Sequence, residues 1–272
     1  MKYLTKSILK IEKRKPTAHK GDYGRVLVVA GSQDYVGAAA LACMAAEAVL
    51  RSGADVVTIA APEKTAWAVN CMLPDIITKK FRGRYFSKKH AADIIKLSEN
   101  YDVILIGPGI GSRKETLAFA KEICKKIKKL KVIDADALKA IKLQDVSNAI
   151  LTPHIKEFEI LSKNSGLLKE NLRDFRKLIN NNVILLKGPI DKIISKNKIA
   201  FNKTGNPVMA KAGTGDVLAG ICAGFLAQTK DLFRSACMAA YLNGAVGDYL
   251  LKEKGRTFIA SDIIKNIHKV FR

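Results

Sequence analysis

The chain has few cysteines and no long apolar run, and both absences exclude whole classes of protein. Its five cysteines are widely spaced, odd in number and form no C-x-x-C pair, so neither a disulfide framework nor a zinc knuckle is indicated. No apolar stretch approaches the ~20 residues that span a bilayer, and the charged N-terminus is unlike a signal peptide. We therefore expect a cytoplasmic protein with no membrane partner.

Acidic residues are scarce relative to basic ones. The 47 Lys and Arg residues exceed the 25 Asp and Glu residues by a net charge of +22, a balance that suits binding to nucleic-acid phosphates. The excess is spread evenly along the chain, however. Its densest run, residues 121–131, keeps Ile123, Ile127 and Leu130 at helical spacing, which predicts a helix with one solvated lysine face. We favour a basic surface without a nucleic-acid partner, and keep a non-catalytic nucleic-acid binder as the alternative.

Short apolar runs alternate with helical patterns along the whole chain. Most runs are apolar throughout, which is typical of parallel strands buried between two helix layers, and the last three are close enough together for an antiparallel edge. We predict one domain over residues 1–272, a three-layer α/β/α fold with a mostly parallel sheet and antiparallel edge strands. The expected strands are residues 25–31, 55–61, 102–107, 131–136, 148–152, 182–188, 191–195 and 198–202.

Helical patterns follow most of the early strands and return after the edge strands. Three of them are rich in Ala and Gly, namely residues 37–53, 216–228 and 234–253, so we expect narrow helices packed tightly in the interior. The other expected helices are residues 87–100, 113–129, 156–163 and 168–182.

Two candidate site features follow expected strands. The turn GPGIGS (107–112) lies where open α/β sheets bind ligands, but it lacks the GxGxxG and Walker spacings and also fits an ordinary tight turn. Asp134 and Asp136 end a buried strand one residue apart, and therefore on one side of an extended segment. Such carboxylates need partners, a metal or solvent; the plainer explanation for Asp136 is a helix cap.

Two later strands also end in polar side chains. Thr152 and His154 flank a proline that stops the strand, and Glu157 follows His154 by three residues at the start of a helix. Lys187 ends the next strand beside a glycine and a proline, a position suited to a nucleotide pocket. A surface histidine and a solvent-facing turn lysine are the ordinary alternatives.

The most informative stretch is AKAGTGDVLAG (210–220). Its glycines let the N–H groups of residues 213–216 converge, and the apolar helix that follows adds its positive dipole end, so the stretch predicts an anion hole. A carboxylate there repels a phosphate unless it acts on the attacked hydroxyl or holds a water. Although Asp216 could be a simple N-cap, we interpret this stretch as the place where a phosphoryl group is transferred.

The segment TGNPVMAKAGTGDVLAGICAGFLAQ (204–228) resembles the signature of the ribokinase-like superfamily, and specifically of the ADP- or ATP-dependent NAD(P)H-hydrate dehydratases. Supporting segments occur in the family's order from residue 19 to about residue 265. They are HKGDYGRVLVVAGS, GAAALACMAAEAVLRSGAD, DVILIGPGIG, VIDADAL, ILTPHIKEFEIL, VILLKG and YLNGAVGD.

The resemblance implies a reaction in which ADP or ATP phosphorylates the hydroxyl of hydrated NADH or NADPH, after which phosphate leaves. Asp216 is implied as the catalytic base and residues 213–215 as the phosphoryl cradle, with Mg²⁺ bridging the nucleotide phosphates and no metal ligand assigned. The positions matched to the hydrated dinucleotide are Ala38, Gly109, His154 and Asp216. Those matched to the adenine nucleotide are Lys187, Gly188, Pro189, Ile190, Asp191 and Gly215.

Three positions depart from the family's pattern. Ala212 replaces a glycine before GTGD, Ile155-Lys156 replaces Pro-Gly after the histidine, and Asn243 stands where histidine is common, so we assign Asn243 no role. A tetramer is expected from the resemblance, and epimerisation of the hydrate is expected to need another protein, since the chain is too short for an epimerase domain. A ribokinase-like kinase of a vitamin precursor or sugar alcohol is the closest alternative function.

Overall fold

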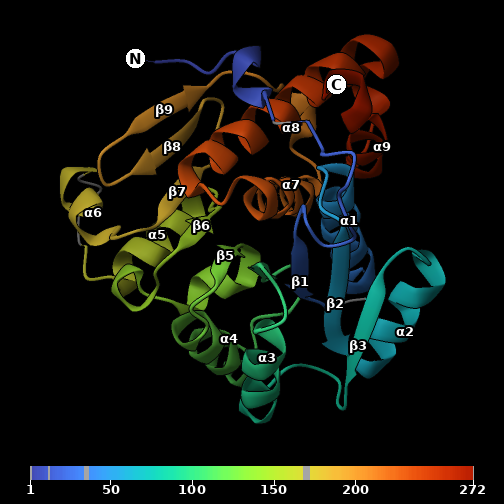
Figure 1. Cartoon of the computed structure of the whole chain (residues 1–272). Coiled ribbons are helices and arrows are strands. Elements are labelled where there is room, and N and C mark those ends of the chain that lie inside the picture. Colours follow the sequence, from blue (N-terminus) through green and yellow to red (C-terminus); the bar gives the residue numbers. More distant parts are fainter. Residues whose placement is uncertain (1, 12, 34–36, 168–171, 272) are drawn as a thin grey trace.

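The computed structural model describes residues 2–11, 13–33, 37–167 and 172–271, and these form one nine-stranded sheet between two helix layers (Figure 1). The strand order is β3-β2-β1-β4-β5-β6-β7-β8-β9. Pairing is parallel from β3 to β7 and antiparallel for the last two pairs. The strands are β1 (Arg25–Val29), β2 (Val56–Pro62), β3 (Ile77–Phe81), β4 (Val103–Ile106), β5 (Leu130–Ile133), β6 (Ala149–Leu151), β7 (Val183–Leu186), β8 (Asp191–Ser195) and β9 (Ile199–Asn202).

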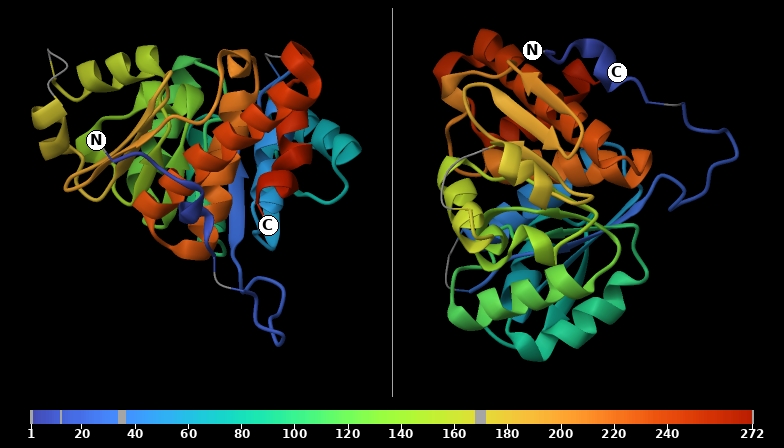
Figure 2. Two further views of the ribbon diagram at one scale, coloured as in Figure 1. Left: turned by 90° about the horizontal axis from the view of Figure 1, so that it is seen from above. Right: turned by 90° about the vertical axis from the view of Figure 1, so that its left-hand side faces the viewer.

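The expected fold class and antiparallel edge are therefore confirmed. One helix layer contains α1 (Ala38–Arg51), α2 (Glu63–Met72), α7 (Thr214–Thr229), α8 (Leu232–Lys254) and α9 (Ala260–Val270); the other contains α3 (Ala91–Ser98), α4 (Lys114–Lys126), α5 (Ile155–Asn164) and α6 (Leu172–Leu178). Figure 2 shows these layers on opposite sides of the sheet.

The sheet is apolar on both faces because neighbouring residues of a strand point in opposite directions. In β1, Val26 and Val28 pack into the core beneath α1 and α7, whereas Leu27 and Val29 pack into the core on the other face. All four side chains are inaccessible to solvent. This two-sided burial explains why the parallel strands read as continuous apolar runs.

The Ala/Gly-rich helices lie in the interior, as expected. A Cβ on Gly220 of α7 would lie 2.2 Å from the carbonyl oxygen of Ala45 in α1, and one on Gly224 would lie 2.7 Å from the carbonyl oxygen of Val49. Only glycine permits such an approach of two helix backbones. This packing fixes α7 against α1 and thereby fixes the position of its first turn.

Several element predictions are corrected by the structure. The lysine-rich helix α4 ends at Lys126 and Leu130 begins β5, so the helical spacing across residues 121–131 does not continue to its end. β3, α2 and α9 were not expected from the sequence. Helix α6 falls within the expected residues 168–182, of which residues 168–171 lie outside the described residues.

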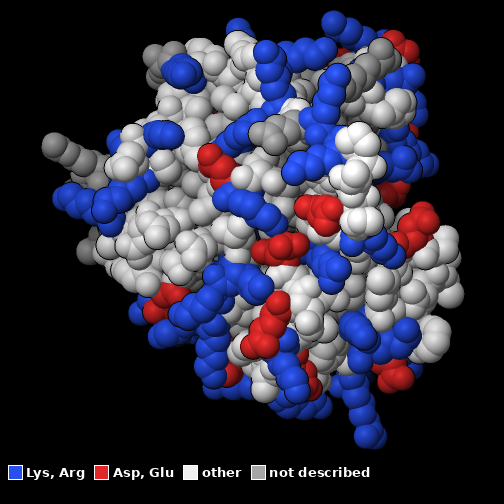
Figure 3. Space-filling view, viewed as in Figure 1, with Lys and Arg blue, Asp and Glu red and all other residues white. Residues whose placement is uncertain are grey.

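The N-terminal segment projects from the domain before the chain enters β1 (Figure 2). Arg14 holds it through a 2.8 Å ion pair with Asp55. Lys and Arg side chains are scattered over the face seen in Figure 3, with acidic side chains among them. In the described parts of the chain, no helix combines the length and apolar character that crossing a membrane requires.

Candidate active site

The first turn of α7 forms a cradle for an anion. Gly213 precedes it with φ +89°, and a Cβ at Gly213 would lie 2.6 Å from Cε of Met44, so both backbone and space require glycine. The hydroxyl of Thr214 donates to the carbonyl oxygens of Met209 and Lys211, each at 2.9 Å. The N–H of Thr214 donates to the carbonyl oxygen of Lys211 at 3.3 Å. Because Gly213 has no side chain to cap the helix, the N–H groups of Gly213 and Gly215 remain for a ligand at the positive dipole end.

Asp216 lies in this same turn, and its carboxyl group is poised to exchange a proton near neutral pH. Burial raises its pKa to about 7, and the negative charges of Asp134 and Glu157 act in the same direction. Lys187 and the N–H of Asp216 itself oppose the rise. A carboxyl group with such a pKa is suited to general base catalysis.

Lys187 is the cation that faces this acidic group. Its Nζ lies 3.2 Å from Oδ1 of Asp134 and 3.9 Å from Oε2 of Glu157, and a Cβ on Gly215 would lie 3.4 Å from the same nitrogen. Burial alone would lower the pKa of Lys187, but Asp134, Glu157 and Asp216 together raise it. The lysine therefore stays charged beside the anion cradle.

The two carboxylates at the end of β5 do not share one side of the chain, which corrects the prediction for Asp134 and Asp136. The strand ends at Ile133, and Ala135 takes φ +51° as a short 3-10 turn, Ala135–Ala140, begins. The buried Asp134 accepts a 2.7 Å hydrogen bond from the hydroxyl of Thr152. Asp136 forms a 2.6 Å ion pair with Lys139 instead and does not cap the turn.

His154 caps helix α5. Its Nδ1 accepts from the N–H of Glu157 at 3.3 Å, and Oε2 of Glu157 accepts from the N–H of His154 at 2.9 Å. This reciprocal pair is a capping box, so the substitution of Ile155-Lys156 for Pro-Gly leaves a well-formed helix start at Ile155. The His154 side chain is still about half exposed (51%) and borders the cavity described below.

The turn between β7 and β8, residues 187–191, is held by its last residue. Oδ1 of Asp191 accepts from the N–H of Gly188 at 3.1 Å, and Oδ2 accepts from Nδ2 of the buried Asn202 at 3.1 Å. Burial raises the pKa of Asp191 against the effect of these hydrogen bonds and of Lys187. Asp191 therefore fixes the shape of the turn that bears Lys187.

A cavity of about 810 Å³ joins the turn between β7 and β8 to the first turn of α7. Its volume is that of a pocket for a small molecule or cofactor. Sequence reasoning included residues 204–211 in the family signature but assigned them no contact with a ligand, although Gly, Asn and Pro signal a loop there. The cavity is lined by His154, Lys187, Gly188, Pro189, Asp191, Thr204, Gly205, Asn206, Pro207, Met209, Ala210, Lys211, Thr214, Gly215, Leu218, Asn243 and Gly244.

Five of the six residues matched to an adenine nucleotide thus line one cavity. The sixth, Ile190, and two of the residues matched to the hydrate, Ala38 and Gly109, are not among its lining residues. Ile190 is exposed. Gly109 follows β4 with φ +64°, and Ala38 is the first residue of α1, in the connection that follows β1. These connections meet where the N–H of Gly31 donates to the carbonyl oxygen of Pro108 at 2.8 Å. Contact of Ala38 and Gly109 with the hydrate stays a prediction.

The other two departures from the family's pattern are Ala212 and Asn243, and the structure places both near the cavity. Ala212 is exposed just before the anion cradle, and Asn243 lies on α8 with its side chain bordering the cavity. A methyl group at position 212 therefore does not fill the cavity that its neighbours line.

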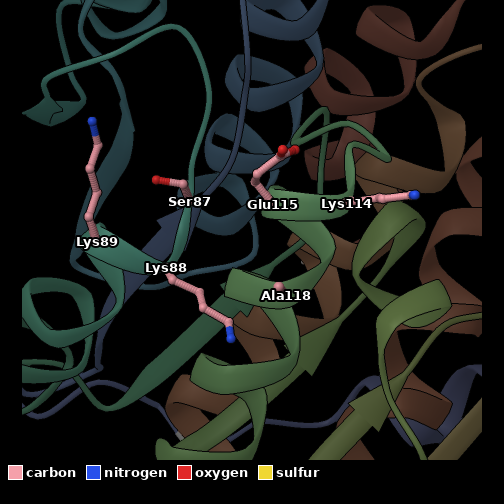
Figure 4. A pocket seen from close by; sticks show the side chains of 6 residues that line it. All are labelled: Ser87, Lys88, Lys89, Lys114, Glu115 and Ala118. Atoms are coloured by element: carbon pink, nitrogen blue, oxygen red, sulfur yellow. The ribbon is translucent and has the colours of Figure 1, made fainter.

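A second hollow, of about 420 Å³, lies on the opposite helix layer between residues 87–89 and the start of α4. The side chains of Lys88, Lys89 and Lys114 point in different directions there (Figure 4). They do not converge on a common point, so this hollow carries no argument for a binding site.

The described residues contain no group of three His, Cys, Asp or Glu side chains that could hold a metal ion. Two of the three carboxylates near the cradle are committed, since Asp134 bonds Thr152 and Lys187, while Glu157 bonds His154. This part of the chain thus offers no all-protein cage for a divalent cation.

The fold and the anion cradle define a ribokinase-like protein. A ribokinase-like superfamily protein from Enterococcus faecalis superposes with a TM-score of 0.83 and 29% identity, over 99% of this chain and 95% of that chain. The ADP/ATP-dependent NAD(P)H-hydrate dehydratase from Bacillus subtilis, co-crystallised with ATP and Mg²⁺, gives a TM-score of 0.81 and 28% identity, over 100% and 99% of the two chains.

A model of the NAD(P)H-hydrate dehydratase family matches residues 26–269. The chain belongs to this family. The bifunctional NAD(P)H-hydrate repair enzyme Nnr of Pyrobaculum aerophilum is 40% identical over 266 residues, which cover 95% of this chain and 52% of that protein. The chain thus spans about half the length of the curated relatives that it matches.

Proposed function

We propose that this chain restores NADH or NADPH from their hydrates in a reaction driven by ADP or ATP. The nucleotide transfers a phosphoryl group to the hydrate hydroxyl: a P–O bond to the nucleotide breaks as one to the hydrate forms. The C–O bond then breaks, phosphate leaves with the bonding electrons, the neighbouring ring carbon loses a proton, and the dihydropyridine ring is restored. One observation carries the proposal: a carboxyl group with a pKa of about 7 lies in the same helix turn as an anion cradle.

Asp216 is the proposed base for the proton of the attacked hydroxyl. At neutral pH a substantial fraction of this group is ionised, and its high pKa makes it a better proton acceptor than an ordinary aspartate. Of the cradle residues Gly213, Thr214 and Gly215, the two glycines would hold the migrating phosphoryl group with their N–H groups, and Thr214 would shape the turn through its N–H bond to the carbonyl oxygen of Lys211. Lys187, close to Gly215, would compensate the charge that develops there.

We place the adenine nucleotide in the 810 Å³ cavity, because this cavity opens on the cradle and contains the sole cation of the carboxylate cluster described above. Magnesium bound to the phosphates would supply further charge neutralisation. The hydrated dinucleotide would approach from the side of Ala38, Gly109 and His154, at the ends of β1, β4 and β6. Ile190 and Asp191 complete the set matched to the nucleotide, with Asp191 acting through the shape of its turn.

The test is to mix purified protein, Mg²⁺, NADHX or NADPHX, and ADP or ATP, and to follow the return of dihydronicotinamide absorbance. Recovery that depends on the nucleotide and releases one phosphate per dinucleotide supports the proposal. Accumulation of a stable phosphoester from a vitamin precursor or sugar alcohol, with no recovery of absorbance, would instead identify the kinase alternative.

The setting of the reaction is also part of the proposal. We infer a cytoplasmic enzyme that assembles as a homo-oligomer, with a tetramer as the expected state, and that works beside an epimerase of the hydrate. The Pyrobaculum relative is named as a bifunctional enzyme, which supports a link between two repair activities. Light scattering of the purified protein measures the assembly, and an epimerisation assay on the whole gene product tests that link.

A further inference from the structure

Asn243 carries a buried hydrogen-bond acceptor that no described residue satisfies. The residue is 8% exposed, and its Oδ1 is shielded from solvent and accepts no hydrogen bond within the described chain. Such an oxygen costs free energy unless a partner arrives. Asn243 borders the cavity assigned to the nucleotide, so a bound molecule is the available source of a donor. The terminal amide can turn about its last torsion to present either of its ends.

The cavity wall around Asn243, formed by α8 and residues 204–211, is held together by close packing and hydrogen bonds. A Cβ on the adjoining Gly244 would lie 2.4 Å from the carbonyl oxygen of Thr204, so helix and loop pack directly against each other. Asp248, further along α8, accepts from the N–H of Gly205 at 2.9 Å and from Nδ2 of Asn206 at 3.1 Å. The loop therefore keeps its shape before a ligand binds, as specific recognition requires.

The same wall is apolar where it faces the cavity beside Asn243. Pro207, Met209 and Leu218 supply this apolar part, while Thr204, Asn206 and Lys211 of the same segment line the cavity with polar groups. The sulfur of Met209 lies 2.2 Å from where a Cβ on Gly247 would be. Glycine at position 247 thus lets the methionine lie flat against α8. Anion-binding groups, by contrast, come from the first turn of α7 and from Lys187. The lining thus divides into a part for phosphates and a part for a flat, apolar group with a polar edge.

We propose that Asn243 binds the amino-bearing edge of the adenine base and is the residue that selects this base; the inference rests on the proposed nucleotide site. With the terminal amide turned so that Oδ1 faces the cavity, Oδ1 accepts a hydrogen bond from the exocyclic amino group. Pro207, Met209 and Leu218 cover the faces of the ring.

The experiment is a calorimetric titration, without hydrate, of ADP and of purine riboside 5′-diphosphate, which is ADP without its amino group. We expect the wild-type protein to bind the analogue about tenfold more weakly. Asn243→Leu should bind the two equally, because it lacks the acceptor. Asn266→Leu, an equivalent change on α9 outside the cavity lining, should keep the wild-type preference and controls for general effects on folding.

The outcomes separate the inference from the proposed function. Equal affinity of the wild-type protein for the two nucleotides would overturn the role of Asn243 and leave the dehydratase untouched, and this comparison needs no variant to fold. A wild-type preference that persists in Asn243→Leu would overturn it as well. If Asn243→Leu instead equalises ADP and 3′-deoxy-ADP, the residue binds the sugar and the base assignment is wrong. Failure to bind any of these nucleotides would overturn both proposals.

Discussion

The ammonium nitrogen of Lys187, at the end of β7, lies 3.2 Å from Oδ1 of Asp134, at the end of β5. The strand between them, β6, ends next to Thr152, whose hydroxyl donates to the same carboxylate oxygen at 2.7 Å. Three neighbouring strands thus each deliver one group to this network, because their parallel directions bring their carboxyl ends to one edge of the sheet. The network lies beside the anion cradle, and the charges of Asp134 and Lys187 act on the pKa of Asp216 in opposite directions.

Asp134→Asn should shift the pH profile of turnover. In the wild-type protein, activity should fall as pH drops below about 7, because protonation removes the base form of Asp216. Asp134 raises the pKa of Asp216 by charge repulsion, so the variant should retain activity to lower pH. Rates of absorbance recovery from pH 5 to pH 9 measure this. An unshifted acidic limb would contradict the coupling of these two carboxyl groups.

Lys187→Met should destabilise the fold by leaving Asp134 buried without its cation. We expect a loss of roughly 2 kcal/mol in the free energy of unfolding, less than for a fully buried pair because the lysine is partly exposed. The double variant Lys187→Met/Asp134→Asn should recover part of this loss, since Asp134 no longer carries an unpaired charge; Glu157 and Asp216 still lack the lysine, so the recovery is partial. Urea denaturation of the four proteins completes the thermodynamic cycle; additive losses would show that the pair is not coupled.

Sequence reasoning located the groups of this site but not their contacts. Asp134, Thr152 and Lys187 each follow an apolar run, so their place at strand ends was foreseeable, and Glu157 was expected at the start of a helix. Their distances depend on the strand order, which brings β5, β6 and β7 side by side and which local patterns do not encode. Asp134 and Asp136 lie on different sides of the chain because Ala135 between them has a positive φ. This conformation is uncommon for alanine, so the residue type gives no reason to expect it.

The elements missed from the sequence have separate explanations. Strand β3 reads ITKKF and lies at an edge with most of its residues exposed, so it lacks the apolar run that marks its neighbours. Helix α9 buries Ala260, Ile263, Ile264 and Ile267. That spacing is the pattern of an amphipathic helix, and the signal for α9 was therefore present in the sequence but was not used.

Asp216→Asn should nearly abolish recovery of NADH from its hydrate and leave nucleotide binding in place. Loss of the proton acceptor should cost about 10²- to 10⁴-fold in rate, whereas the N–H groups of the cradle persist. Asp136→Asn is the matched control, because that carboxylate pairs with Lys139 outside the cavity lining. Unimpaired turnover of Asp216→Asn would refute the assignment of the base.

The same substitution should stabilise the protein at neutral pH. The pKa of Asp216 is raised from 3.8 to about 7 in the folded state. Between these values the folded state holds a proton that the unfolded state has released, so wild-type stability falls as pH rises from about 4 to 7. Asparagine carries no such charge, and the variant should gain on the order of 4 kcal/mol relative to wild type at pH 8, because each unit of the pKa shift corresponds to about 1.4 kcal/mol. Thermal melts at pH 4 and pH 8 test this; an equal difference at both pH values would contradict it.

Gly213→Ala and Gly215→Ala should separate folding from binding within one helix turn. Gly213 has φ +89°, and its Cβ would meet Met44 at 2.6 Å, so alanine there should destabilise the fold by about 1–3 kcal/mol.

Gly215 lies within α7, and its Cβ would meet Lys187 Nζ at 3.4 Å. Alanine there should leave the melting temperature unchanged or higher, yet place a methyl group where the nucleotide phosphate is expected. Calorimetric titration should therefore show weaker ADP binding by a well-folded Gly215→Ala protein. Unchanged affinity would mean that the phosphate does not approach this turn.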